Sequence, residues 1–350
     1  MQFDLQKLVR DNIQKLTPYS SARHEFTGKA SVFLDANENA YGSPLPDRFN
    51  RYPDPLQWQL KFQLASIKGV PAENVFVGNG SDEVIDLAYR IFCTPAVDNV
   101  IICPPTYGMY EVSGNINDVA VKKVNLINHF QLNVEGILAA VDDNTKLIFI
   151  CSPNNPTANN MRREDVEVIL NNFSGIVIID EAYINFSKQK TFIQELTEYP
   201  NLIVMQTLSK AWGLAALRLG LCYASKDIIE LFNKVKPPYN INDASQQLGV
   251  AALKNIDLVN EWINVVVKQK EWLIKEMGNF TFVKTIYPSD ANFFLMKVND
   301  AAKLYTYLSD NEVVVRNRSK EPGCDNCLRV TIGTPEENQQ LIQLLKNYNQ

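Results

Sequence analysis

Short apolar runs rich in β-branched residues recur along the first two thirds of the chain. Seven of them, between Asn74 and Ser225, read NVFVG, NVIICPP, AVKKVNL, KLIFICSP, GIVIID, LIVMQT and LGLCYA. Stretches between them, such as SDEVIDLAYRIF and REDVEVILNNF, carry apolar residues at helical spacing. Strands that are apolar on both faces and alternate with helices predict an α/β fold. We expect a mostly parallel central sheet with helices on both faces.

The pattern changes after Asn242. A long amphipathic segment from Ala244 to about Met277 predicts helix. The runs ANFFLMKV, EVVVRNR and CLRVTIG then alternate as strands do, and another helix begins at Pro335. These shifts predict an N-terminal helix and arm over residues 1–28, a large domain over 29–243 and a smaller α+β domain over 244–350.

Composition and charge narrow the class of protein. A hydrophobic content of 46% and a charged content of 21% are ordinary for a globular protein. The formal net charge of −5 argues against nucleic-acid binding, which needs a basic face. We find neither a signal-peptide pattern nor an apolar run of the ~18 residues that a membrane span needs. Cysteines within or beside apolar runs are typical of a reducing compartment, so a cytoplasmic protein is expected.

Chemically active side chains follow the apolar runs at the point where each run ends. The carboxyl ends of parallel strands meet at one edge of a sheet, where ligands bind. The residues that this rule brings together are Ser81, Asp82, Tyr107, Asn155, Asp180, Tyr183, Thr207, Ser209, Lys210 and Arg218. One edge therefore gathers a glycine loop, an aromatic ring, an amide, a carboxylate, a phenol and an amine.

That combination points to pyridoxal phosphate. The aldehyde of this cofactor needs a lysine amine, which Lys210 would supply. Its ring nitrogen needs a buried carboxylate if it is to stay protonated, and Asp180 ends an apolar run. Asn155 and Tyr183 are candidate donors to the ring oxygen, and Tyr107 could stack on the ring.

The cofactor phosphate is a dianion, which favours backbone N–H groups at a helix start, hydroxyls and an arginine. Ser81 and Asp82 open a helix after the glycine loop, and Thr207, Ser209 and Arg218 supply the rest. Taken singly, each residue has a simpler interpretation, such as a solvated lysine, a helix-capping aspartate or a core tyrosine. Their occurrence in order, each at a strand end, favours the cofactor site.

With these residues the chain resembles the fold-type I aminotransferases, and within them the histidinol-phosphate aminotransferases of the class II subfamily. The blocks that carry the resemblance, in that family's order, are LTPYSSAR, LDANENAYG, RYPDP, GNGSDE, PPTYGMY, CSPNNPT, DEAYINF, LSKAWGLAALRLG, KPPYN and CLRVTIGT. The resemblance implies a transaminase that interconverts histidinol phosphate and 2-oxoglutarate with imidazole acetol phosphate and glutamate. Lys210, Asp180 and Tyr183 would be its catalytic residues. Ala40, Ala158 and Ala216 depart from the family's usual proline and glycines without removing a chemical group.

The resemblance also implies a homodimer with the site at the subunit boundary. Tyr52 would then reach the cofactor phosphate of the neighbouring subunit. Arg329, helped by Arg316, would hold the anionic end of the substrates. The residues implied to line the substrate side are Tyr19, Asn37 and Tyr41.

Alternatives stay open at this stage. An aromatic-amino-acid aminotransferase or a decarboxylase of an amino-acid phosphate ester would share the same strand-end chemistry. A non-catalytic regulator of this fold would carry a DNA-binding module, for which the ~28 preceding residues are too few. Cys324 and Cys327 form a single CxxC, and the two histidines, His24 and His129, lie far away in sequence. Neither a metal site nor a Ser–His pair is therefore expected.

Overall fold

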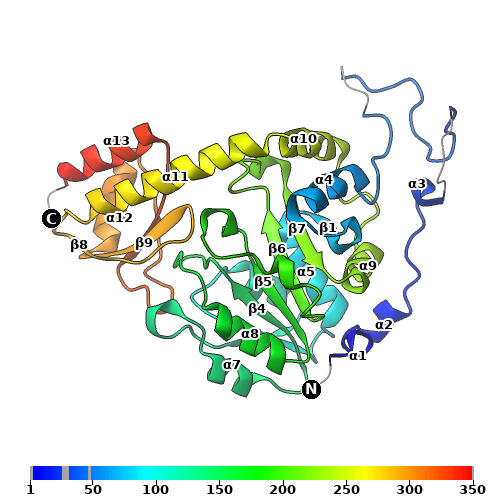
Figure 1. Ribbon diagram of the computed structural model, residues 1–350, viewed down its shortest axis with the longest axis horizontal. Coiled ribbons are helices and arrows are strands. Elements are labelled where there is room, and N and C mark those ends of the chain that lie inside the picture. The colour runs from blue at the N-terminus through cyan, green and yellow to red at the C-terminus, as the bar shows by residue number, and fades with distance from the viewer. Residues whose placement is uncertain (1–2, 26–30, 46–48, 349–350) are drawn as a thin grey trace.

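The computed structural model describes residues 3–25, 31–45 and 49–348 (Figure 1). Its larger part is built around a seven-stranded sheet with the order β1-β7-β6-β5-β4-β2-β3. The strands are β1 (Val75–Asn79), β2 (Asn99–Ile102), β3 (Ala120–Lys123), β4 (Thr145–Cys151), β5 (Ile176–Asp180), β6 (Leu202–Thr207) and β7 (Leu219–Ala224). The strands β2 to β6 pair in parallel, and β7 runs antiparallel to both β6 and β1. The prediction of a mostly parallel sheet made from the seven apolar runs is confirmed.

Both faces of this sheet are buried except at the edge strand β3, which explains why the other runs are almost continuously apolar. In β5, Val177 and Ile179 pack into the core on one face, and Ile176 and Ile178 pack into the core on the other. Side chains alternate across a strand, so a sheet with two covered faces needs apolar residues at every position. The covering helices are α4 (Trp58–Lys68), α7 (Val134–Ala140), α8 (Arg163–Asn172) and α10 (Asp243–Leu253) on one face, and α5 (Ser81–Phe92), α6 (Met109–Ile116) and α9 (Lys226–Val235) on the other.

A second, antiparallel sheet of four strands has the order β10-β11-β9-β8. Its strands are β8 (Val283–Ile286), β9 (Phe293–Val298), β10 (Arg316–Asn317) and β11 (Cys327–Thr331). It packs with α12 (Ala301–Asp310) and α13 (Pro335–Lys346) around a core of its own. The helix α13 begins with a capping box between Thr334 and Glu337, which satisfies free N–H groups at the helix start. The sequence pattern had indicated three of these strands and missed β8.

One long helix links the two sheets. The segment predicted as helix from residue 244 to 277 is broken at Asn255 into α10 and α11 (Ile256–Met277). The side chain of Asn255 donates to the carbonyl of Ala251, a local bond of the kind that competes with helix continuation. Figure 1 shows α11 running from the large sheet to the small one, and Val266 packs against the cores of both. The domain boundary at residues 243 and 244 stays a prediction.

The N-terminal region consists of short helices and an extended arm. The helices are α1 (Leu5–Leu8), α2 (Asp11–Gln14) and α3 (Ala22–Glu25). Val9 and Ile13 anchor this region by packing into the core beneath α5 and α9. Figure 1 shows residues 31–45 standing away from the body of the molecule. Among the described residues, no helix is long and apolar enough to cross a membrane.

Candidate active site

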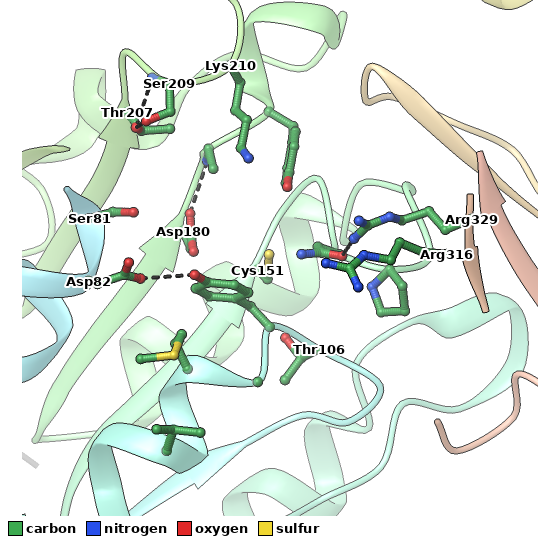
Figure 2. A pocket seen from close by; sticks show the side chains of 18 of the residues that line it. Ser81, Asp82, Thr106, Cys151, Asp180, Thr207, Ser209, Lys210, Arg316 and Arg329 are labelled. Atoms are coloured by element: carbon green, nitrogen blue, oxygen red, sulfur yellow. Dashed lines mark hydrogen bonds between the residues drawn. The ribbon is translucent and has the colours of Figure 1, made fainter. Parts of the chain in front are cut away.

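A cavity of about 530 Å³ lies at the carboxyl edge of the parallel strands, where the two sheets face each other (Figure 2). The predicted residues that line it are Ser81, Asp82, Tyr107, Asn155, Asp180, Tyr183, Thr207, Ser209, Lys210, Arg218, Arg316 and Arg329. Strand-end geometry thus brings together side chains that are up to about 250 positions apart in the chain.

Lys210, three residues beyond the end of β6, and Asp180, at the end of the neighbouring strand β5, face the same space (Figure 2). Asp180 is the last residue of β5 and is buried, with its carboxylate accepting hydrogen bonds from Tyr110 Oη at 2.6 Å and Ala182 N at 3.0 Å. Burial raises the pKa of Asp180, while these hydrogen bonds oppose the rise. The side chain of Lys210 opens onto the cavity. Even so, desolvation lowers its pKa, and the charge of Arg329 lowers it further.

Tyr110 is a site residue that the sequence analysis missed. Its ring is buried and stacks on Phe149 with 4.8 Å between ring centroids. Its backbone carbonyl accepts a hydrogen bond from Tyr89 Oη at 2.7 Å. The available signal was a second tyrosine in PPTYGMY, three residues after Tyr107, and the two rings meet edge to face with centroids 5.6 Å apart.

An ion-pair and hydrogen-bond network joins the glycine loop to the rest of the site. Tyr107 Oη donates to Asp82 Oδ1 at 3.0 Å, and Arg218 Nη2 lies 3.5 Å from Asp82 Oδ2. Burial and the nearby carboxylate of Asp82 both raise the pKa of Tyr107. The phenol of Tyr107 therefore stays protonated and acts as a donor at neutral pH.

Two glycines allow the backbone of β7 to approach this loop. Gly80 has a φ of +79°, and a Cβ there would lie 2.5 Å from Arg218 Nη2. A Cβ on Gly220 would lie 2.1 Å from the carbonyl carbon of Gly80. The loop is also held by a hydrogen bond from Gly80 N to the carbonyl of Arg218 at 2.6 Å. Gly220, two residues after Arg218, is therefore required by packing against the loop.

Hydroxyl groups stand beside this loop. Thr207 Oγ1 lies 3.0 Å from Ser209 Oγ, and it accepts a hydrogen bond from Ser209 N at 3.1 Å. Ser81 is the first residue of α5, whose N-terminus carries the positive end of the helix dipole. The combination of a helix start, hydroxyls and Arg218 is suited to a phosphate group.

The opposite wall comes largely from the small sheet. Arg329 Nη1 donates to Asn155 Oδ1, and Arg316 lies directly opposite Arg329 in the β10–β11 ladder. Tyr183 is buried, and its ring centroid is 5.7 Å from Lys210 Nζ. Figure 2 shows Arg316 and Arg329 reaching from these strands toward Lys210 and Asp180.

Two further lining residues, Arg318 and Glu321, escaped the sequence analysis. Arg318 follows Arg316 by two positions in VVVRNRSK, and alternation along a strand is the signal that could have found it. Glu321 lies in the turn that follows, where sequence pattern gives no orientation.

Four predicted residues lie away from this cavity within the single chain. Asn37 and Tyr41 are exposed on the extended arm, and Tyr52 is half-exposed and stacks on Tyr239 with centroids 4.5 Å apart. Tyr19 lines a separate cavity of about 710 Å³ beside Trp58. Their role on the substrate side stays a prediction.

The alanines that depart from the family pattern fall in different backbone states. Ala158 is buried with a φ of +70°, a left-handed conformation in which glycine is favoured. Its N–H nevertheless donates to the carbonyl of Asn154 at 2.8 Å and closes the loop that carries Asn155. Ala216 lies in the 3-10 turn Ala215–Leu217, and Ala40 is exposed.

Cys324 and Cys327 are buried free thiols. Within the described part of the chain, no group of three His, Cys, Asp or Glu side chains could hold a metal ion.

Several known proteins that resemble this chain are aminotransferases. The family model for aminotransferase class I and II matches residues 36–345. The chain is 52% identical to a histidinol-phosphate aminotransferase of Cytophaga hutchinsonii over 348 residues, which cover 99% of this chain and 100% of the relative. It is similar in fold to the crystal structure of the histidinol-phosphate aminotransferase from Clostridium acetobutylicum, with a TM-score of 0.79 and 24% identity over 85% of this chain and 90% of that one. It is also similar to the enzyme of that name from Sinorhizobium meliloti in complex with pyridoxal-5′-phosphate, with a TM-score of 0.76 and 22% identity over 89% of this chain and 90% of that one.

Proposed function

The chain belongs to the class I and II aminotransferases, and we propose that it transfers the amino group of L-histidinol phosphate to 2-oxoglutarate with pyridoxal 5′-phosphate as cofactor. The products would be imidazole acetol phosphate and L-glutamate, a step of histidine biosynthesis. The observation that carries the proposal is the pairing of Lys210 with buried Asp180 across one cavity, opposite a face that bears arginines. The expected compartment remains the cytoplasm.

The cavity residues fit the cofactor. A Cβ on Gly80 would collide with the guanidinium of Arg218. Only glycine at this position therefore lets the loop and the arginine lie close together beside the space for the phosphate. Ser81 at the start of α5, together with Thr207 and Ser209, would hold the phosphate. Asp180 would face the ring nitrogen, Tyr107 would stack, and Asn155 and Tyr183 would bind the ring oxygen. When bound, the cofactor supplies an aldehyde that accepts the amino group and a ring that takes up electron density.

The chain's own residues would supply the proton movements. Lys210 Nζ would act as general base when it removes the proton from the substrate Cα. It would then act as general acid when it donates that proton during transfer of the amino group. A pKa lowered by desolvation makes its free amine available nearer to neutral pH. The carboxylate of Asp180, steadied by Tyr110, would hold the proton on the ring nitrogen. Arg316 and Arg329 would orient the anionic end of either substrate by forked hydrogen bonds.

Spectroscopy of the half-reaction tests the substrate. The yellow holoenzyme is mixed in separate samples with histidinol phosphate, phenylalanine, tyrosine or threonine phosphate, and the visible absorption is followed. Fast bleaching by histidinol phosphate, reversed by 2-oxoglutarate, is expected. Fast bleaching by phenylalanine alone would establish the aromatic alternative, and release of CO₂ from threonine phosphate would establish a decarboxylase.

We also propose that the active form is a homodimer in which Tyr52 reaches the neighbouring cofactor phosphate. The arm supports this, because Val32, Leu34 and Tyr41 are 68%, 89% and 102% exposed. Apolar side chains gathered on one exposed segment mark an interaction surface. Light scattering gives the mass of the assembly.

Mixing two variants tests the crossing of Tyr52. A hybrid dimer of Lys210→Ala and Tyr52→Phe subunits has one site with both residues intact only if Tyr52 acts across the boundary. Recovery of cofactor affinity in the mixture is therefore expected. If neither component gains affinity on mixing, although hybrids form, Tyr52 acts within its own subunit.

A further inference from the structure

A third arginine lines the cavity from the same face of the small sheet as Arg316 and Arg329. In the antiparallel ladder of β10 and β11, Arg316 lies opposite Arg329. Side chains alternate along an extended strand, so residue 318, two positions later, returns to the face of residue 316. The pairing continues to this point, because Arg318 N donates to the carbonyl of Cys327 at 2.8 Å. The fold therefore sets three guanidinium groups side by side.

Two of these arginines have N–H groups without a hydrogen-bond acceptor in the described part of the chain. Within the described residues, Arg318 Nε and Arg329 Nε are buried without a hydrogen-bond partner. The ion pair that Arg318 does make, from Nη1 to Glu321 Oε1, is long at 3.8 Å. Adjacent like charges repel, and the charges of Arg318 and Arg316 both lower the pKa of Arg329, after burial as the largest cause. Such a cluster is favourable when a multiply charged anion binds it.

The two anionic groups offered by the proposed substrates differ in charge and in acceptors. A phosphate monoester carries about −1.5 to −2 charges at neutral pH and three strong acceptor oxygens. A carboxylate carries a single charge and can be satisfied by one guanidinium fork. Arg329 together with Arg316 would suffice for a carboxylate, whereas the phosphate monoester has charge and oxygens left for a third donor.

We propose that Arg318 is a specificity-determining residue that binds the phosphate monoester group of the amino donor beside Arg316 and Arg329. The assignment rests on the proposed function, and it deepens it by naming the residue that separates phosphate esters from carboxylates. Glu321 competes with the ester for Arg318, because its carboxylate lines the same cavity.

Two charge-neutralising variants of the holoenzyme test the proposal. Arg318→Gln is compared with Lys320→Gln, a matched control that removes the same charge from an exposed position two residues along the loop and outside the cavity lining. The readouts are the KM of histidinol phosphate, the KM of glutamate, and the Kd of glycerol 3-phosphate from calorimetry. Glycerol 3-phosphate has no amine, so its binding is measured without turnover.

Arg318→Gln is expected to raise the KM of histidinol phosphate and the Kd of glycerol 3-phosphate by about tenfold to a hundredfold, as befits a lost charge-assisted hydrogen bond. It should change the KM of glutamate by less than about threefold, and Lys320→Gln should change every value by less than about twofold. Equal losses for glutamate and histidinol phosphate would make Arg318 a general anion ligand and overturn the proposal. Unchanged values would overturn it as well.

Glu321→Gln provides a test of opposite sign. Removing the competing carboxylate should tighten glycerol 3-phosphate by up to about fivefold, and weaker binding would contradict the proposal. Failure of the wild-type holoenzyme to convert histidinol phosphate would refute the proposed function alone. The calorimetric comparison would still decide whether Arg318 binds phosphate monoesters.

Discussion

Tyr110 donates a hydrogen bond to the carboxylate of Asp180 across 2.6 Å, and both side chains are buried. This bond favours the ionised acid, whereas burial favours the neutral one. Tyr110→Phe should therefore raise the pKa of Asp180. A hydrogen bond to a charged group contributes about 1.5–3 kcal/mol, which corresponds to roughly one to two pH units. The acid limb of the pH profile of kcat/KM, and the pH titration of the visible absorption, should move upward by that amount.

Tyr89→Phe is the matched control for this prediction. It removes a buried phenol from the same aromatic stack, but that phenol donates to the backbone carbonyl of Tyr110 and not to the acid. It should lower the melting temperature and leave the acid limb in place. Equal movement of the limb in both variants would mean that Tyr110 acts only through packing.

Lys210→Ala should abolish turnover and the visible absorption of the bound cofactor. Loss of the proton transfer alone costs on the order of 10²–10⁴ in rate, and loss of the covalent link adds to it. Lys188→Ala, which removes an exposed lysine, is the control and should be unchanged. A yellow, active Lys210→Ala enzyme would refute the assignment of this amine.

Gly220→Ala should destabilise the loop at Gly80 and Ser81. The added Cβ would meet backbone atoms of Gly80 and Ser81 at 2.1 and 2.2 Å, and backbone cannot give way as a flexible side chain does. Overpacking of this kind costs about 1–3 kcal/mol or more, and cofactor affinity should fall with it. The measurement is chemical denaturation together with cofactor titration. Gly278→Ala meets only ordinary contacts at 3.5 Å, so comparable losses there would discredit the steric explanation.

Lys61→Met should stabilise the protein at neutral pH. Lys61 is 1% exposed, and desolvation lowers its pKa from 10.5 to about 8. A base whose folded pKa lies below its unfolded pKa destabilises the fold fully below about pH 8 and not at all above about pH 10.5. The gain should be about 3 kcal/mol at pH 7 and should shrink as the pH rises through that window. Urea denaturation at several pH values checks this, with exposed Lys254→Met as the control. A pH-independent gain would point to apolar packing instead.

The sequence was most informative where backbone topology alone determines position. Lys210 and Asp180 could be placed together because parallel strands bring their carboxyl ends to one edge, whatever the side-chain packing. The contact between Tyr110 and Asp180 could not, since it depends on how α6 docks on the sheet. The strand β8 was missed because it is only half-buried, with Lys284 and Thr285 exposed, so it lacks an apolar run.

Which side chains of the small sheet point into the cavity was harder to predict. Arg316 and Arg329 were expected from the family resemblance, whereas Arg318 required the register of a strand that is only two residues long. In the proposed dimer Tyr52 would act on a neighbouring copy, and for such a contact a single chain holds no local pattern.

The cavity wall is divided between two sheets: Asp180 and the turn that carries Lys210 belong to strand ends of the seven-stranded sheet, and Arg316 and Arg329 lie on the four-stranded one. Substitutions on the smaller sheet can therefore change which amines are accepted while Lys210 and Asp180 keep their positions, although loss of the charge of Arg329 would also change the pKa of Lys210. In evolution this arrangement allows substrate specificity to diverge between gene copies while the strand ends that carry Lys210 and Asp180 are kept. In directed evolution it identifies β10 and β11 as the segments to randomise first.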